Sequence, residues 1–356
     1  MRGRTSSQLS VVCLLNLEDA IPATHPIRKI KQLANEVLHS LEGFLSKMYA
    51  DTGRPSIPPE RLLLSSVLMA LYSVRSERMF CERLRYDLLF RWFLDMDLEQ
   101  EPFAPTSFCK NRERLIEHEV AKAFFGAIVE RARIEGLVSS DHFSVDGTLI
   151  EAWASLKSFR PKDEPAASDN NGWADFRGKK RSNETHASTT DPESRLWRKG
   201  KGREAKLCFM GHSLMENRSG LLLDMRVTVA SGHAERDAAL EMVDALGLRD
   251  ATLGVDRGYD TRDFVQGCRS RGITPHVAQH TNRRRSAVDG RTTRWPGYAI
   301  SLIKRRLIEQ GFGWAKSIAG LRRSRLRGIR KTQLLAHVVG AAYNLLRIAR
   351  LIPQSS

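Results

Sequence analysis

The sequence predicts an α+β protein in which a helical N-terminal domain precedes a mixed α/β domain. Apolar residues recur at helical spacing up to about residue 136, and alternating strand-like patterns begin after residue 140. The chain of 356 residues is long enough for two domains. The net charge of +16 is unevenly placed, because residues 1–140 hold 19 basic and 18 acidic residues, whereas residues 141–356 hold 38 and 23.

The first part is predicted to be helical throughout. Residues 1–55 read as a lead segment with one helix, and residues 56–136 as a helical domain. Strongly apolar helices are expected over 62–74 and 79–94, and Pro105 suits the first turn of a further helix. Composition leaves two interpretations of this domain equally open, DNA binding and dimerisation.

The second part, residues 140–350, alternates between strands and helices. Three strands are followed by helix, strand, helix, strand and helix, which is the order of a mixed sheet of the ribonuclease-H type. Pro275 favours an edge position for the last strand. A polar stretch at about 157–206 interrupts the pattern and is interpreted as a long loop. The predicted strands cover 142–146, 207–214, 221–229, 251–256 and 273–278, and the helices cover 234–246 and 298–316.

Charge and cysteine usage narrow the class of protein. Residues 281–331 hold 15 basic residues and only two acids, Asp289 and Glu309, which favours a polyanionic partner over a merely solvated surface. The five cysteines are odd in number and far apart, as in a reduced cytoplasmic protein. No run of about 18 consecutive apolar residues is present, so no membrane partner is expected.

Three acids are candidates for chemistry. Asp146 lies on the first predicted strand and Asp256 at the carboxyl end of the fourth, and these strands are neighbours in such a sheet. Glu309 shares a helix face with Arg305 and Lys316 if residues 298–316 form one straight helix. Taken singly, each Asp could be a turn residue and Glu309 an ion-pair partner.

Converging carboxylates would need compensation. Two unit charges ~4 Å apart repel by about 4 kcal/mol at an effective dielectric of 20. A hard divalent cation with oxygen ligands, Mg²⁺ or Mn²⁺, relieves that repulsion, and a pair of such ions suits phosphodiester chemistry.

These motifs together resemble a known family, the DDE transposases of the IS-five-like bacterial insertion sequences. The resemblance runs over nearly the whole chain, from the helical N-terminal domain to a C-terminal signature of Tyr, Arg, Glu and Lys. The signature expects Tyr at position 302, which is Leu here, and Tyr298 lies on the same helix face one turn earlier. The segments that carry the resemblance are 54–60, 70–73, 89–93, 143–162, 189–192, 211–212, 255–260 and 305–316.

The resemblance implies a metal-dependent enzyme that cleaves the ends of a mobile element and joins them to target DNA. Asp146, Asp256 and Glu309 would be the catalytic triad, holding two Mg²⁺ or Mn²⁺ ions, with Arg305 and Lys316 on the phosphates. It also implies DNA as partner, a homodimer on paired ends, and a bacterial, nucleoid-associated location. A catalytically inactive repressor and a host nuclease of the same fold are the alternatives.

The basic stretch gives one further expectation. Its most arginine-rich part is predicted to follow the DNA backbone through phosphate contacts. With Tyr298, Arg305 and Lys316, the expected DNA-binding residues are Arg322, Arg323, Arg325 and Arg327.

Overall fold

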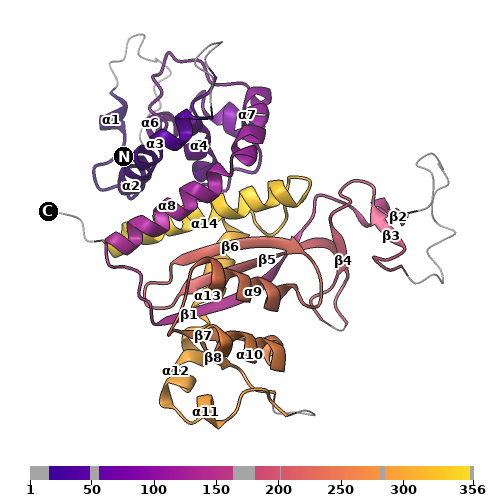
Figure 1. The fold of residues 1–356 in the computed structure, drawn as a ribbon. Coiled ribbons are helices and arrows are strands. Elements are labelled where there is room, and N and C mark those ends of the chain that lie inside the picture. The colour runs from indigo at the N-terminus through magenta and orange to yellow at the C-terminus, as the bar shows by residue number, and fades with distance from the viewer. Residues whose placement is uncertain (1–15, 49–55, 163–180, 201, 281–284, 353–356) are drawn as a thin grey trace, which may run out of the picture.

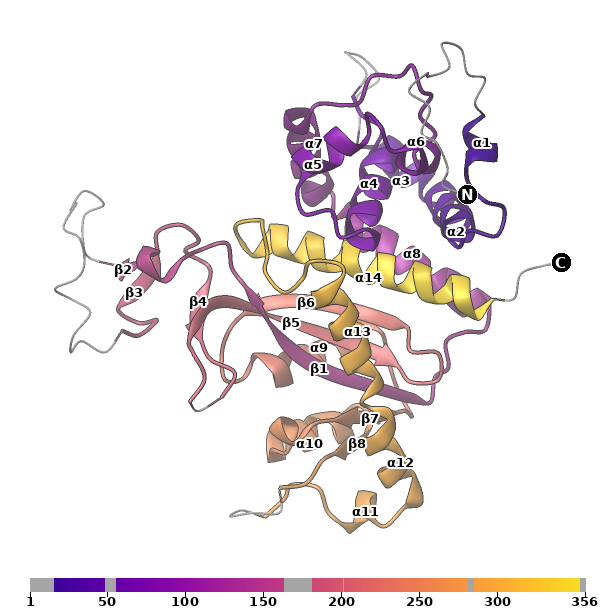
Figure 2. The same ribbon diagram turned by 180° about the vertical axis from the view of Figure 1, so that it is seen from behind.

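The computed structural model describes residues 16–48, 56–162, 181–200, 202–280 and 285–352. Figure 1 shows a helical region at one end, a sheet in the middle and a smaller group of helices at the other end. Two long helices, α8 (Val120–Ile134) and α14 (Ile329–Leu351), lie side by side between the helical region and the sheet in both views (Figures 1 and 2).

The N-terminal region is helical, as predicted, but the described part of the lead segment 1–55 holds three helices where one was expected. The predicted helix over 79–94 is wrong, because it is two helices. Asp87 accepts a hydrogen bond from the Phe90 amide at 3.1 Å, and it caps a new helix there. Besides α8, the helices are α1 (Leu17–Ala20), α2 (Ile27–Ser40), α3 (Glu42–Ser46), α4 (Pro59–Leu71), α5 (Glu77–Arg83), α6 (Leu88–Phe93) and α7 (Pro105–Glu117).

The predicted ribonuclease-H-like sheet is confirmed in strand order and direction. The main path is β4-β5-β1-β7-β8, with β6 also paired to β5. The β1–β5 and β5–β6 pairs are antiparallel, whereas β1–β7 and β7–β8 are parallel. Pro275 lies on β8, at the end of this path, as expected. The strands are β1 (His142–Glu151), β4 (Arg195–Trp197), β5 (Lys206–Glu216), β6 (Leu222–Val229), β7 (Thr252–Val255) and β8 (Thr274–Val277).

The helices of this domain include one correction. The predicted single helix over 298–316 is interrupted at Arg305 and Arg306, where the bonds shorten to the i→i+3 pattern: the Arg306 amide bonds the Ile303 carbonyl at 3.2 Å. Angles counted along one straight helix therefore do not hold across this point. The helices are α9 (Ala234–Ala245), α10 (Arg262–Ser270), α11 (Gly290–Thr293), α12 (Pro296–Lys304) and α13 (Leu307–Ser317).

The polar stretch at 157–206 is more ordered than a loop in its described parts. It contains the short 3₁₀ helix η1 (Leu156–Ser158), the antiparallel strands β2 (Phe159–Pro161) and β3 (His186–Ser188), and β4 of the main sheet. Asp191 and Glu193 follow β3 and accept hydrogen bonds from the Gly328 and Ile329 amides. These carboxylates therefore cap the N-terminus of α14.

Helix α14 is an element that the sequence analysis did not predict. The Asn344 side chain bonds both the amide and the carbonyl of Leu222, at 2.9 and 2.7 Å. Gln333 does the same for the Val227 amide and the Met225 carbonyl. These two side chains satisfy backbone groups along β6 that no neighbouring strand satisfies.

By length and composition α14 could also cross a membrane, but 61% of its most apolar window is buried inside the protein. Because α14 packs against α2, α4 and α8 as well as β6, it joins the two predicted domains.

Candidate active site

Asp146 and Asp256 are brought together by the register of two parallel strands. The last paired residues of β1 and β7 are Ser144 and Gly254. Two residues further along each strand stand Asp146 and Asp256, and residues two apart point to the same face. Asp146 accepts a hydrogen bond from the Gly147 amide at 2.8 Å. Asp256 directly follows β7 and caps the 3₁₀ helix η2 (Arg257–Tyr259) through a 2.7 Å bond from the Gly258 amide.

The pKa values of these acids are shifted by burial and by the charges of their neighbours. The pKa of Asp146 is raised to about 7, first by burial and then by the charges of Asp256 and Glu235, while the Gly147 amide and Arg305 lower it. The pKa of Glu235 is also raised, first by burial and then by Asp256. Three carboxylates therefore interact within one partly buried region, and Arg305, Arg236 and Lys199 offset only part of their repulsion.

Glu235 is the acid that the sequence analysis missed. It lies in the first turn of α9, and a Cβ on Gly147 would meet its Oε1 at 2.6 Å. An acid in the first turn of a helix is common, because its negative charge interacts favourably with the positive end of the helix dipole. Its position therefore gave no signal, and only the packing of α9 against β1 reveals it.

The residues of the C-terminal signature differ in their position relative to the aspartates. Arg305 lies over β7, since a Cβ on Gly254 would stand 3.3 Å from the Arg305 Cβ. Lys316 is half-buried; burial, then Lys199 and Arg322, lower its pKa, while Asp146 and Glu151 raise it. Both residues thus lie in the field of Asp146.

Glu309 stands between these two cations in the chain, in the first turn of α13, and its side chain is exposed. In the described part of the chain, no group of three or more His, Cys, Asp or Glu side chains is close enough to hold a metal ion. The structure therefore sets Asp146 near Asp256 but closes a three-acid cage with neither Glu309 nor Glu235.

Tyr298 anchors its helix in this structure. Its hydroxyl donates to the Val277 carbonyl at 2.7 Å, and its ring stands edge-on to His276 at 5.5 Å between centroids. The phenol therefore ties α12 to the edge strand β8.

The arginine-rich segment continues the sheet beyond β1. The Glu151 amide bonds the Arg322 carbonyl at 3.0 Å, and the Ser324 amide bonds the Glu151 carbonyl at 2.8 Å. The Arg323 guanidinium lies 4.9 Å from the Trp153 ring. All four arginines of this segment are exposed beside the strand that carries Asp146: Arg322, Arg323, Arg325 and Arg327.

The donor chemistry around the paired aspartates fits a hard divalent cation. The donors there are carboxylate oxygens, which Mg²⁺ and Mn²⁺ prefer. Tyr259 is fully buried, and its hydroxyl lacks a hydrogen-bond partner among the described residues. The charges of Glu235, Asp146 and Asp256, in that order after burial, raise the pKa of this phenol. A bound cation would relieve the repulsion that raises these pKa values.

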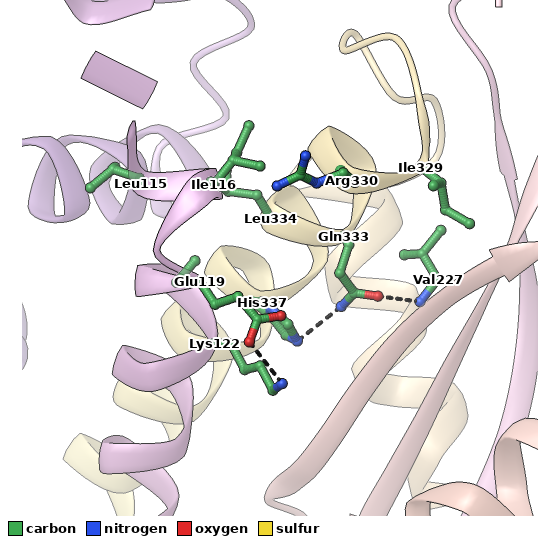
Figure 3. Close-up of a pocket in the computed structure, with 11 residues that line it drawn as sticks. Leu115, Ile116, Glu119, Lys122, Val227, Ile329, Arg330, Gln333, Leu334 and His337 are labelled. Carbon is green, nitrogen blue, oxygen red and sulfur yellow. Dashed lines mark hydrogen bonds and ion pairs between the residues drawn. The ribbon is translucent and has the colours of Figure 1, made fainter. Parts of the chain in front are cut away.

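A cavity of about 260 Å³ lies elsewhere, where α8 and α14 meet β6 (Figure 3). Gln333 and His337 line it, and their side chains are hydrogen-bonded at 2.9 Å. It contains none of the acids described above.

The strand order and directions define a ribonuclease-H-like fold. A family model for the transposase DDE domain matches residues 140–345, and one for a transposase domain (DUF772) matches residues 15–114. The chain belongs to the DDE transposases, enzymes of DNA cleavage and strand transfer.

Two solved structures with low similarity are the piggyBac transposase synaptic complex with hairpin DNA and the Mos1 transposase paired-end complex with left transposon end. The first is 10% identical, with a TM-score of 0.42 over 90% of this chain and 73% of that one. The second is 10% identical, with a TM-score of 0.21 over 76% of this chain and 82% of that one. A comparison with curated proteins gave no match.

Proposed function

We propose that this transposase binds the ends of an insertion sequence and catalyses Mg²⁺- or Mn²⁺-dependent strand cleavage and strand transfer through Asp146, Asp256 and Glu309. The observation that carries the proposal is the β1–β7 register, which sets Asp146 opposite Asp256 at the sheet edge. Two cations held there would help to activate the attacking oxygen and to stabilise the leaving oxygen.

Glu309 would complete the triad by a movement of its exposed side chain. Arg305 precedes it by one turn and Lys316 follows it, and both already interact with the charge of Asp146. Glu309 itself has no hydrogen bond or ion pair within the described residues, so nothing there holds its carboxylate away.

The cations around the acids suit a phosphodiester backbone. Arg305 and Lys316 would hold the phosphates next to the reacting bond, and the four exposed arginines of 322–327 would bind the flanking DNA. A DNA contact by Tyr298 stays a prediction, since its hydroxyl is bonded to Val277. We further propose a homodimer on paired ends, membership of the IS-five-like subfamily and a bacterial cytoplasmic, nucleoid-associated location.

A strand-cleavage assay on element-end DNA with Mg²⁺ tests the triad. We expect Asp146→Asn, Asp256→Asn and Glu309→Gln each to lower the cleavage rate by about a hundredfold or more, as loss of a preorganised charge does. Asp237→Asn is the control, because Asp237 is exposed on α9. Cleavage by Glu309→Gln at the wild-type rate would remove Glu309 from the triad, and full activity of Asp146→Asn would refute the site.

A further inference from the structure

The carboxylate of Glu235 has a position that the three-acid assignment leaves unexplained. Its Oε1, Cγ and Cδ atoms would stand 2.6, 2.7 and 2.9 Å from a Cβ on Gly147. Only glycine at 147 therefore leaves room for this carboxylate. The amide of the same glycine donates a hydrogen bond to the Asp146 carboxylate, so the backbone of Gly147 lies between the carboxylates of Glu235 and Asp146.

Asp146 and Glu235 approach Gly147 from opposite faces of the sheet. The side chains of Ser144 and Asp146 point to the face that carries Arg305, whereas a side chain on Gly147 would point to the other face, toward α9. Strand β7 ends at Val255 and its pairing with β1 ends at Ser144, so β1 continues without β7 beside Asp146 and Gly147. Side chains from both faces can meet there, around the open edge of β1.

The environment of Glu235 differs from that of an ordinary helix-start acid. Asp237, on the same turn, is exposed. Glu235 is partly buried, has no hydrogen bond or ion pair within the described residues, and lies near Asp256 and Asp146. Burying a carboxylate beside two others costs free energy unless a cation compensates it.

Tyr259 is an independent indication that a ligand belongs here. Its side chain is 0% exposed, and its hydroxyl finds no partner among the described residues. Glu235 is the acid whose charge acts on it most strongly. A buried hydroxyl without a partner is rare in folded proteins and indicates an absent ion or water.

We propose that Glu235 supplies a further carboxylate to the divalent-cation site of Asp146 and Asp256. The proposal rests on the proposed function, because it assumes a cation between those two aspartates. In this arrangement α9 contributes a ligand from the face opposite α13. Gly147 is required because any side chain there would displace that ligand.

Binding of Mn²⁺ to the full chain without DNA tests this role apart from activity. Electron paramagnetic resonance would measure free Mn²⁺, and thermal unfolding would measure the rise in Tm that Mn²⁺ causes. We expect Glu235→Gln to bind Mn²⁺ at least about tenfold more weakly than wild type. We expect Asp237→Asn to match wild type and Asp146→Asn to lose binding.

Gly147→Ala provides a second variant with the carboxylate retained. Its methyl group would occupy the place of the Glu235 carboxylate, which is the flexible end of a side chain and can move. We expect weaker Mn²⁺ binding with little change in the metal-free Tm.

Wild-type Mn²⁺ affinity in Glu235→Gln, with binding lost in Asp146→Asn, would overturn the role of Glu235 and leave the aspartate site standing. Wild-type affinity in Asp146→Asn would instead refute the proposed function itself.

Discussion

At the scale of single residues, the buried histidines make the protein sensitive to acid. Burial lowers the pKa of His337 to about 4, and the same holds for His212 and His276. A histidine whose folded-state pKa lies below its unfolded value stabilises the fold above pH 6.5. That stability is lost as the pH falls toward 4, because the unfolded chain binds the proton more tightly.

We therefore expect the free energy of unfolding to fall between pH 6.5 and 4, with His337 contributing at most about 3 kcal/mol. His337→Gln should make this decline shallower, whereas His39→Gln should not, because His39 is exposed. Urea unfolding at a series of pH values measures the slope. Equal slopes for wild type and His337→Gln would contradict the expectation.

At the scale of elements, α13 is fixed by a close approach to the sheet. Gly311 is buried, and a Cβ on it would meet the Met215 Cε at 3.0 Å. A mid-helix glycine costs ~1 kcal/mol relative to alanine. Here the glycine allows α13 to lie close to β5, and Lys316 of the same helix lies in the field of Asp146.

Two glycines of α13 form a matched test of that packing. Gly311→Leu should destabilise the protein by about 1–3 kcal/mol, because its side chain overlaps Met215 and Leu222. Gly313→Ala should instead stabilise it by up to ~1 kcal/mol, since a Cβ there meets nothing within 4 Å. Thermal unfolding gives both values, and the interpretation fails if the two changes have the same sign.

The break between α12 and α13 also belongs to this scale. Each of its residues has helical dihedral angles, and the difference lies only in which carbonyl each amide bonds. Helical periodicity cannot distinguish the two bonding patterns over one turn. The common face predicted for Arg305, Glu309 and Lys316 assumed one continuous helix, and the two cations on either side of the break interact with Asp146.

At the scale of the whole molecule, the candidate acids lie among basic side chains. The acids lie at the open edge of the sheet, and the cations Lys199, Arg305, Lys316 and Arg322 lie around them. Helix α14 connects this region to the N-terminal helices. DNA bound at the acids would therefore pass the basic side chains of residues 285–331, the described part of the basic stretch.

Affinity for element-end DNA should depend steeply on salt. If about 6–10 phosphates are contacted, the affinity should fall by ~10³–10⁵ between 50 and 200 mM salt. Removing two of the exposed cations, Arg322 and Arg323, by alanine substitution should reduce the slope of log affinity against log salt by about 2. Arg249→Ala, at an exposed site after α9, should leave the slope unchanged. A nearly flat salt response in wild type would exclude this mode of binding.

The sequence by itself determined the order of β1, β5, β6, β7 and β8, the helices α9 and α10 between them, and the edge position of β8. It also predicted that Asp146 and Asp256 converge. These follow from local alternation and from the rule that neighbouring parallel strands end together. The resemblance added the family and the expected roles of Arg305, Glu309 and Lys316.

Only the tertiary structure decided the rest. Glu235 became visible because α9 crosses β1 at a glycine, and α14 because Gln333 and Asn344 satisfy the edge of β6. Neither contact has a local pattern, since each joins residues about 90 to 120 positions apart. Spacing along a chain reports its neighbours within a turn or a strand, whereas these contacts depend on where whole elements pack.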